Sequence, residues 1–286
     1  MDEQALEDEI ASKLRAGQID AALDDARLAL RQYPNSSDLN QLLGAALFKK
    51  GLNEDARTAF RRAIQLDPSS SENYYNLALV DLSENRYADA ITPLEAFLRL
   101  NPENAGAYLF LGRAYHNLNR TAPAIEQFKK AIALAPQLPL AHYHLGYAYQ
   151  SQGDLKAALE EFKKEIEYNP QFYDSYWLAG NIELGEGKLD AAENLFRVGI
   201  KAKPQAYQSH YGLGRVMLAK KNFPGAEVEL KKALESNPDH VESHYALARV
   251  YQQTGKTEDS RIEFEVCAKL NAQRQKMGSG IAGQNP

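Results

Sequence analysis

The most constraining feature of the sequence is a proline that returns every 34 residues. Chains with a fixed period of about 20 to 50 residues are built by stacking one small structural unit many times. Numbering each repeat from the third residue after its proline divides most of the chain into eight repeats. The prolines are Pro34, Pro68, Pro102, Pro136, Pro170, Pro204 and Pro238, and the repeats begin at Glu3, Ser37, Ser71, Ala105, Pro139, Tyr173, Tyr207 and Val241.

Three positions of the repeat each keep one kind of side chain, with Ile10 at position 8 and Ala26 at position 24 as exceptions. Small residues at positions 8 and 20 allow two helices to approach closely, and a large apolar residue at position 24 is predicted to fill the space between repeats. Position 8 holds Ile10, Gly44, Ala78, Gly112, Gly146, Gly180, Gly214 and Ala248. Position 20 holds Ala22, Ala56, Ala90, Ala124, Ala158, Ala192, Ala226 and Ser260. Position 24 holds Ala26, Phe60, Leu94, Phe128, Phe162, Phe196, Leu230 and Phe264.

A fourth position supplies the turn. Position 15 holds Gly17, Gly51, Asn85, Asn119, Gly153, Gly187 and Gly255. Glycine and asparagine tolerate the left-handed backbone conformation that closes a helix. Each repeat is therefore predicted to be a helix, a tight turn and a second helix.

The segments NYYNLALVDLSENRYADA (73–90), AYLFLGRAYHNLNRTAPA (107–124) and AHYHLGYAYQSQGDLKAALEEF (141–162) resemble the tetratricopeptide repeat family. The resemblance implies an all-α fold, a right-handed α-solenoid superhelix of helix-turn-helix repeats over residues 3–272. The glycine-rich residues 273–286 are predicted to be a disordered tail. Repeats 1 and 8 are atypical, with Glu9 and Ile10 replacing a Leu-Gly pair and Ala272 replacing the proline.

Three residues inside the array depart from the family pattern. Phe97 and Glu165 stand where the second helix usually has a small residue, and Pro93 falls within a predicted second helix. Local spreading or a kink is expected there.

Composition excludes several classes of function. A net charge of −5 argues against sequence-independent binding of nucleic acid, which requires an excess of lysine and arginine. No apolar run reaches the roughly 18 residues of a membrane span. The start MDEQALEDEI is acidic, unlike a secretory signal, and the single Cys267 permits no internal disulfide. A cytoplasmic protein is predicted, with the periplasm as the alternative if a signal peptide has been removed.

The histidines and glycines are interpreted as structural. His142, His210 and His244 share position 4, where repeats 3, 4 and 6 have a tyrosine, so they are predicted to pack rather than to bind metal. His240 and His244 have the helical spacing of a metal pair, but His240 falls in a turn. Gly212 and Gly214 lack the third glycine of a dinucleotide-binding loop. We find no set of nucleophile, base and orienting residue, and we expect neither catalysis nor a cofactor nor a metal.

The first helix of each repeat leaves a stripe at positions 2, 5, 9 and 12 that the core does not require. In the resembling family this stripe lines a concave ligand groove. Repeats 1 to 3 offer an apolar lining suited to an amphipathic helix: Ala11, Leu14, Ala45, Phe48, Leu79 and Leu82. Repeats 4 to 8 offer aromatic rings and arginines, suited to an acidic or carboxylate-bearing segment. Tyr211 with Arg215, and Tyr245 with Arg249, are four residues apart and are predicted to stack. The predicted groove residues are Tyr75, Arg113, Tyr143, Tyr147, Trp177, Asn181, Tyr211, Arg215, Tyr245 and Arg249.

The predicted function is a non-catalytic scaffold or adaptor that binds a peptide or protein segment in this groove. Tyrosine is common at position 5 of the family whatever the ligand, so the tyrosines fit an inherited pattern equally well. The pairing of lysine and asparagine that clamps chaperone tails in some relatives is missing. The alternative is a regulatory or substrate-presenting subunit or fragment of a larger enzyme. Self-association through the apolar half of the groove or the end helices is a third hypothesis.

Overall fold

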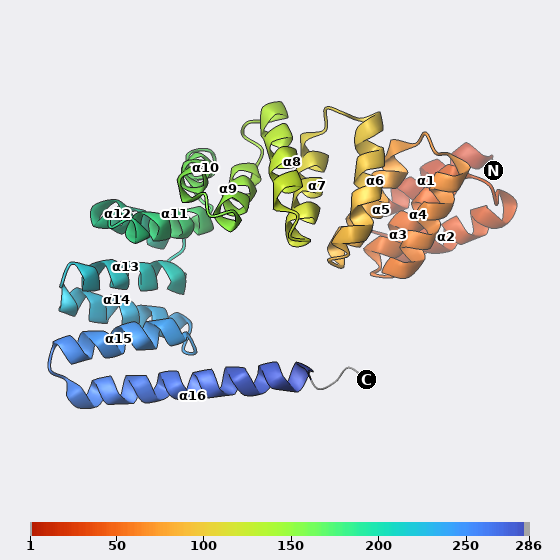
Figure 1. The fold of residues 1–286 in the computed structure, drawn as a ribbon. Helices are drawn as coiled ribbons and strands as arrows, with labels where there is room; N and C mark the ends of the chain where they lie inside the picture. Colours follow the sequence, from red (N-terminus) through yellow and green to blue (C-terminus); the bar gives the residue numbers. More distant parts are fainter. Residues whose placement is uncertain (1, 283–286) are drawn as a thin grey trace. The chain divides into compact units, whose positions relative to one another are not determined.

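The computed structural model describes residues 2–282 of the chain, and the side chains of residues 2–276. The described part consists of 16 α-helices and contains no strand (Figure 1). The prediction of an all-α fold is confirmed. The helices are α1 (Glu3–Arg15), α2 (Ile19–Gln32), α3 (Ser37–Lys49), α4 (Asn53–Leu66), α5 (Ser71–Ser83), α6 (Tyr87–Leu100), α7 (Ala105–Asn117), α8 (Thr121–Leu134), α9 (Ala141–Ser151), α10 (Leu155–Tyr168), α11 (Tyr173–Gly185), α12 (Leu189–Ala202), α13 (Tyr207–Ala219), α14 (Phe223–Ser236), α15 (Val241–Gln253) and α16 (Thr257–Ala282).

The chain divides into two compact units, Met1–Gln152 with α1 to α9 and Gly153–Pro286 with α10 to α16. Within each unit, helices pack on their neighbours along the chain. The first helices of adjacent repeats also contact each other, α1 with α3 and α7 with α9 in one unit, α11 with α13 and α13 with α15 in the other. Each unit is therefore a stretch of α-solenoid, in which the first helices lie next to one another.

The small residue at position 8 is required by the large one at position 24 of the same repeat. A Cβ atom on Gly112 would lie 2.5 Å from Cε1 of Phe128, and one on Gly180 would lie 2.6 Å from Cε1 of Phe196. Position 24 thus fills space within its own repeat, in addition to the predicted space between repeats. Phe196 does both, because a Cβ atom on Gly212 of the next repeat would lie 2.4 Å from its ring.

The turns between paired helices have the predicted left-handed residue. All seven glycines and asparagines predicted at position 15 have positive φ, between 59° and 82°. Repeat 7 places Lys221 there, with φ 59°. A hydrogen bond from Asn222 N to Met217 O at 2.8 Å closes this turn. The corresponding hydrogen bond in the previous repeat runs from Lys188 N to Glu183 O at 2.9 Å. Backbone closure of the helix end therefore imposes the left-handed conformation whatever the residue type.

The atypical residues inside the array are accommodated locally. Helix α6 continues through the buried Pro93 as one element. The ring of Phe97 lies 4.8 Å from that of Tyr75. The side chain of Glu165 is buried and accepts a hydrogen bond from Asn169 Nδ2 at 3.3 Å. Helix α16 includes residues 273–282, part of the segment predicted to be a disordered tail, and residues 283–286 lie outside the described part of the chain.

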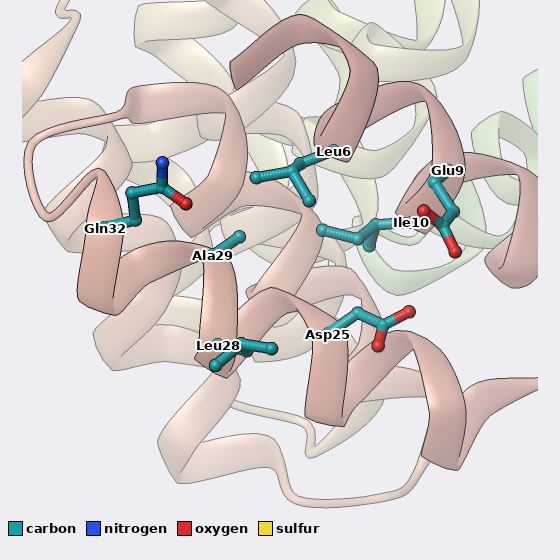
Figure 2. Close-up of a pocket in the computed structure, with 7 residues that line it drawn as sticks. All are labelled: Leu6, Glu9, Ile10, Asp25, Leu28, Ala29 and Gln32. Atoms are coloured by element: carbon teal, nitrogen blue, oxygen red, sulfur yellow. The ribbon is translucent and has the colours of Figure 1, made fainter. Parts of the chain in front are cut away.

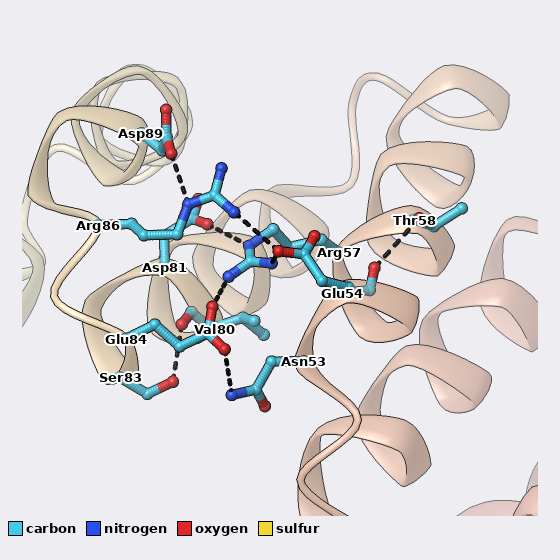
Figure 3. Close-up of polar contacts among 10 residues, drawn as sticks. All are labelled: Asn53, Glu54, Arg57, Thr58, Val80, Asp81, Ser83, Glu84, Arg86 and Asp89. Atoms are coloured by element: carbon cyan, nitrogen blue, oxygen red, sulfur yellow. Dashed lines mark hydrogen bonds and ion pairs between the residues drawn. The ribbon is translucent and has the colours of Figure 1, made fainter. Parts of the chain in front are cut away.

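A buried ion pair joins repeats 2 and 3. Arg57 of α4 is fully buried, and its Nε lies 2.7 Å from Oδ1 of Asp81 on α5, which is 1% exposed. Glu54 and Glu84 bind the same guanidinium (Figure 3). Burial raises the pKa of Asp81 despite the neighbouring Arg57. This contact was not predicted from the sequence, because other repeats have a different pair of residues at these positions.

Candidate functional site

Four of the predicted groove residues form one cluster in the second compact unit. The rings of Trp177 on α11 and Tyr211 on α13 have centroids 6.2 Å apart. The guanidinium carbon of Arg215 lies 5.5 Å from the centre of the Tyr211 ring. Arg215 also donates a hydrogen bond from Nη1 to Oδ1 of Asn181 at 3.1 Å. The stacking predicted for Tyr211 and Arg215 is present, and the cluster joins repeats 6 and 7.

His240 belongs to this aromatic cluster, although its spacing from His244 in the sequence is that of a metal pair. Its ring centroid lies 4.8 Å from that of Tyr207 and 4.9 Å from that of Tyr211. Burial lowers the pKa of His240, and its Nδ1 lies 2.7 Å from Ser243 Oγ. The imidazole is therefore neutral near pH 7 and extends the aromatic surface toward repeat 8.

Two adjacent pockets follow the cluster along α13 and α15. One has a volume of about 350 Å³, and Tyr211, Arg215, Tyr245 and Arg249 contribute to its lining. The other has a volume of about 650 Å³. Arg215, Leu218 and Arg249 line both pockets, so they form one continuous surface. The larger pocket is lined by Leu184, Arg215, Leu218, Ala219, Lys221, Phe223, Arg249 and Gln253.

The larger pocket is cationic. Arg215, Lys221 and Arg249 line it, and no carboxylate does. Within the described part of the chain neither arginine takes part in an ion pair, and Arg249 has no hydrogen bond or ring contact, so the predicted stacking of Tyr245 and Arg249 is not observed. The smaller pocket contains one carboxylate, Glu242, which lies 3.2 Å from Nε2 of His240. The positive charge of the larger pocket is thus left without a partner.

Repeats 4 and 5 place a second group of predicted residues together in the first compact unit. The rings of Tyr143 and Tyr147 lie 6.2 Å apart, and His116 meets Tyr147 edge-on at 5.5 Å. Burial, together with the charges of Arg113 and His116, lowers the pKa of His144 to about 3. Arg113 and Tyr147 therefore flank a surface of aromatic and neutral imidazole rings.

Other predicted lining residues belong to the core. The ring of Tyr75 packs between those of Phe97 and Phe110, at 4.8 Å and 6.2 Å. Leu14 is buried in the first core cluster, and Ala45 and Phe48 pack against that cluster. The apolar half of the stripe is thus partly used in packing.

The position-4 histidines have the predicted packing role. Nε2 of His210 lies 3.0 Å from the carbonyl oxygen of Pro204, and Tyr176 donates its hydroxyl to Pro170 O at 3.2 Å from the same position. His244 has both ring nitrogens engaged, Nε2 with Pro238 O at 2.8 Å and Nδ1 with Glu263 Oε2 at 2.5 Å. A metal pair with His240 would require these contacts to break. The searched part of the chain has no group of three side chains that would hold a metal ion.

Comparisons with known proteins identify the repeat family and its fold. A tetratricopeptide repeat profile matches residues 8–71, 75–139, 143–207 and 178–230, and a second profile of the same description matches 217–275. MamA from Desulfovibrio magneticus RS-1 is 29% identical, with a TM-score of 0.56 over 59% of this chain and 96% of that one. YrrB, a tetratricopeptide repeat protein with an unusual peptide-binding site, is 26% identical, with a TM-score of 0.57 over 66% of this chain and 98% of that one.

A more distant structure, the Cut9–Hcn1 complex, is 20% identical with a TM-score of 0.58 over 84% of this chain and 48% of that one, and it bears on the fold alone. Comparison with curated proteins gave no match. Among the described helices, none has the length and apolar character needed to cross a membrane. The predicted compartment stays a prediction.

Proposed function

Because the chain belongs to the tetratricopeptide repeat family, we propose that it is a non-catalytic interaction scaffold whose ligand is a peptide segment bound along α11, α13 and α15. The segment carries at least one carboxylate. The similar protein YrrB has a peptide-binding site, and that likeness supports the proposal.

The observation that carries the proposal is the cationic pocket of about 650 Å³ with no carboxylate in its lining. Arg215 and Arg249 lie one repeat apart and line it together. An arginine guanidinium binds a carboxylate through two parallel hydrogen bonds, which makes such a pair specific as well as strong. Leu184, Leu218 and Phe223 line the same pocket, so an acidic residue beside an apolar one fits it best.

Lys221 adds support from backbone strain. It occupies the left-handed position where every other repeat with a positive φ at position 15 has glycine or asparagine. A lysine costs more there than either of those residues. Strained residues of this kind concentrate at functional sites. The side chain of Lys221 adds a third cation to the lining of the larger pocket.

Trp177 makes the proposal directly testable, because it is the only tryptophan in the chain. A peptide bound along α11 and α13 would change its fluorescence. Peptides selected on an array with the wild-type protein would be titrated while tryptophan emission is followed. We expect acidic sequences to be selected, and we expect raised salt to weaken them.

The double variant Arg215→Ala with Arg249→Ala is expected to weaken the selected peptides by tenfold or more (about 1.4 kcal/mol) with little change in thermal stability. Arg197→Ala is the matched control, since this arginine lies on α12 outside both pockets and pairs with Glu193 at 2.8 Å. Equal binding by the wild type and the double variant at low and high salt would exclude the proposed site.

A further inference from the structure

The first repeat has a pocket between α1 and α2, lined by Leu6, Ile10, Leu28 and Ala29 and by the polar side chains of Glu9, Asp25 and Gln32. Its volume is about 230 Å³. Figure 2 shows Leu6 and Ile10 of α1 facing Ala29 of α2 across it, with Leu28 at its edge. Leu28 is 65% exposed, the highest value among the large apolar side chains described. Repeat 1 therefore presents an apolar surface that no described helix covers.

The corresponding positions also line a pocket inside the array, and there the second helix of the preceding repeat covers them. In repeat 7 a pocket of about 450 Å³ is lined by residues at positions 4, 7, 23 and 26, and α12 of the preceding repeat forms its other wall. These positions are His210, Leu213, Glu229 and Lys232 in repeat 7 and Leu6, Glu9, Asp25 and Leu28 in repeat 1. The open surface of repeat 1 is thus shaped for the second helix of another repeat.

Among the described helices, α16 is the one second helix that has no first helix of a following repeat packed on it. Asn194 at position 22 of α12 lines the repeat 7 pocket together with Lys232 at position 26. The corresponding residue of α16 is Ile262, which is 45% exposed. Stacking α16 of one copy on repeat 1 of the next would place Ile262 opposite Leu28, so that both apolar side chains lose solvent contact.

Charges agree with the same register. Inside the array, position 25 of one repeat contacts position 11 of the next: Lys163 Nζ lies 2.7 Å from Glu183 Oε1, and Tyr115 donates to Glu95 Oε1 at 2.7 Å. Continued from one copy to the next, the rule places Glu265 of α16, which pairs with Arg261 in its own helix, beside Lys13 of α1, which pairs with Glu9 and Asp25. These two residues have opposite charge.

We propose that the open surface of repeat 1 binds α16 of a second copy of this chain, continuing the repeat stacking from one molecule to the next. The contact joins two different surfaces, so an assembly of any length still has one free surface of each kind, one at each end. Association is then open-ended unless the rotation between copies closes a ring.

The test is light scattering coupled to size-exclusion chromatography from about 1 µM to about 1 mM protein. The wild type is expected to exceed its monomer mass of 31.9 kDa progressively as concentration rises. Leu28→Glu and Ile262→Glu should each raise the concentration required for association by about tenfold or more, because each buries a charge in the contact. Leu134→Glu is the control, because Leu134 of α8 is 44% exposed but lies at neither end.

Mixing the two end variants separates this contact from any symmetric one. Each variant retains one intact surface, so an equimolar mixture should form a dimer and nothing larger. Circular dichroism verifies that each variant remains helical. A wild type that stays monomeric throughout the range would overturn the proposal. So would end variants that associate as the wild type does, or a mixture that stays monomeric, because the contact would then lie elsewhere or pair like surfaces.

Discussion

Nδ1 of His210 lies 2.6 Å from Oε2 of Glu229, while Nε2 of the same ring lies 3.0 Å from the carbonyl oxygen of Pro204. A carbonyl oxygen and an ionised carboxylate both only accept hydrogen bonds. Each ring nitrogen therefore faces a hydrogen-bond acceptor, and the buried imidazole of His210 links Pro204, in the loop before α13, to Glu229 of α14. His244, Pro238 and Glu263 repeat the arrangement in the last repeat.

This pair predicts a specific dependence of stability on pH. Burial raises the pKa of Glu229, but the hydrogen bonds from His210 and Lys232 outweigh it, and the pKa lies below its ordinary value of 4.5. A carboxylate whose pKa is lowered by folding stabilises the protein above the unfolded-state pKa, and that stabilisation is lost as the pH falls through the folded-state pKa. We expect Glu229→Gln to be less stable than the wild type at about pH 6 and to approach it at about pH 3. Urea unfolding at several pH values measures the difference, and a constant offset across that range would contradict the assignment.

Two glycines of α7 should respond to alanine with opposite signs. A Cβ atom on Gly112 would lie 2.5 Å from the ring of Phe128, so Gly112→Ala should lower the free energy of unfolding by about 1 to 3 kcal/mol through overpacking. A Cβ atom on Gly106 would meet only Asn104 Oδ1, at 3.4 Å. Gly106→Ala should stabilise the protein by up to about 1 kcal/mol, because alanine favours the helix. Chemical unfolding of the two variants tests this pair, and a Gly112→Ala variant as stable as the wild type or more stable would show that the space beside Gly112 is not limiting.

Exchanging the residues of two turns should shift stability in opposite directions. Lys221 and Asn119 both have φ 59° at position 15. Asparagine tolerates this conformation better than lysine, so Lys221→Asn should stabilise and Asn119→Lys should destabilise, each by about 1 kcal/mol or less. Lys221→Asn should also weaken acidic peptides, since it removes a cation from the larger pocket. Thermal unfolding and tryptophan titration report the two effects separately. A variant that gains stability and keeps full affinity would remove Lys221 from the binding site.

The buried pair of Arg57 and Asp81 should show strong coupling. Removing one partner leaves a buried charge poorly compensated, so Asp81→Leu should cost about 3 kcal/mol or more. The double variant Arg57→Met with Asp81→Leu should be more stable than either single variant, because apolar side chains then fill the site. A double-mutant cycle from urea unfolding measures the interaction energy. Additive effects would show that Glu54 and Glu84 alone hold the arginine.

The period of 34 residues was sufficient to predict the helix pairs and their turns. Local chemistry sets these features: a proline follows every second helix except α16, a left-handed residue closes each first one, and small side chains at positions 8 and 20 permit close packing. Lys221 escaped prediction because its side chain does not favour the left-handed conformation that backbone closure imposes. Its presence in the larger pocket was equally invisible in the sequence.

The stripe of groove residues was readable from the sequence, since helical spacing alone determines which positions share a face. Which of those residues stay available was decided only by tertiary packing. The ring of Tyr75 packs against those of Phe97 and Phe110, whereas Arg249 has no partner among the described residues. Burial and pairing depend on side chains from other helices, whose distances in space are not encoded by the spacing within one repeat. The sequence therefore determined the repeated architecture, and the tertiary structure decided where charge and apolar surface remain for a partner.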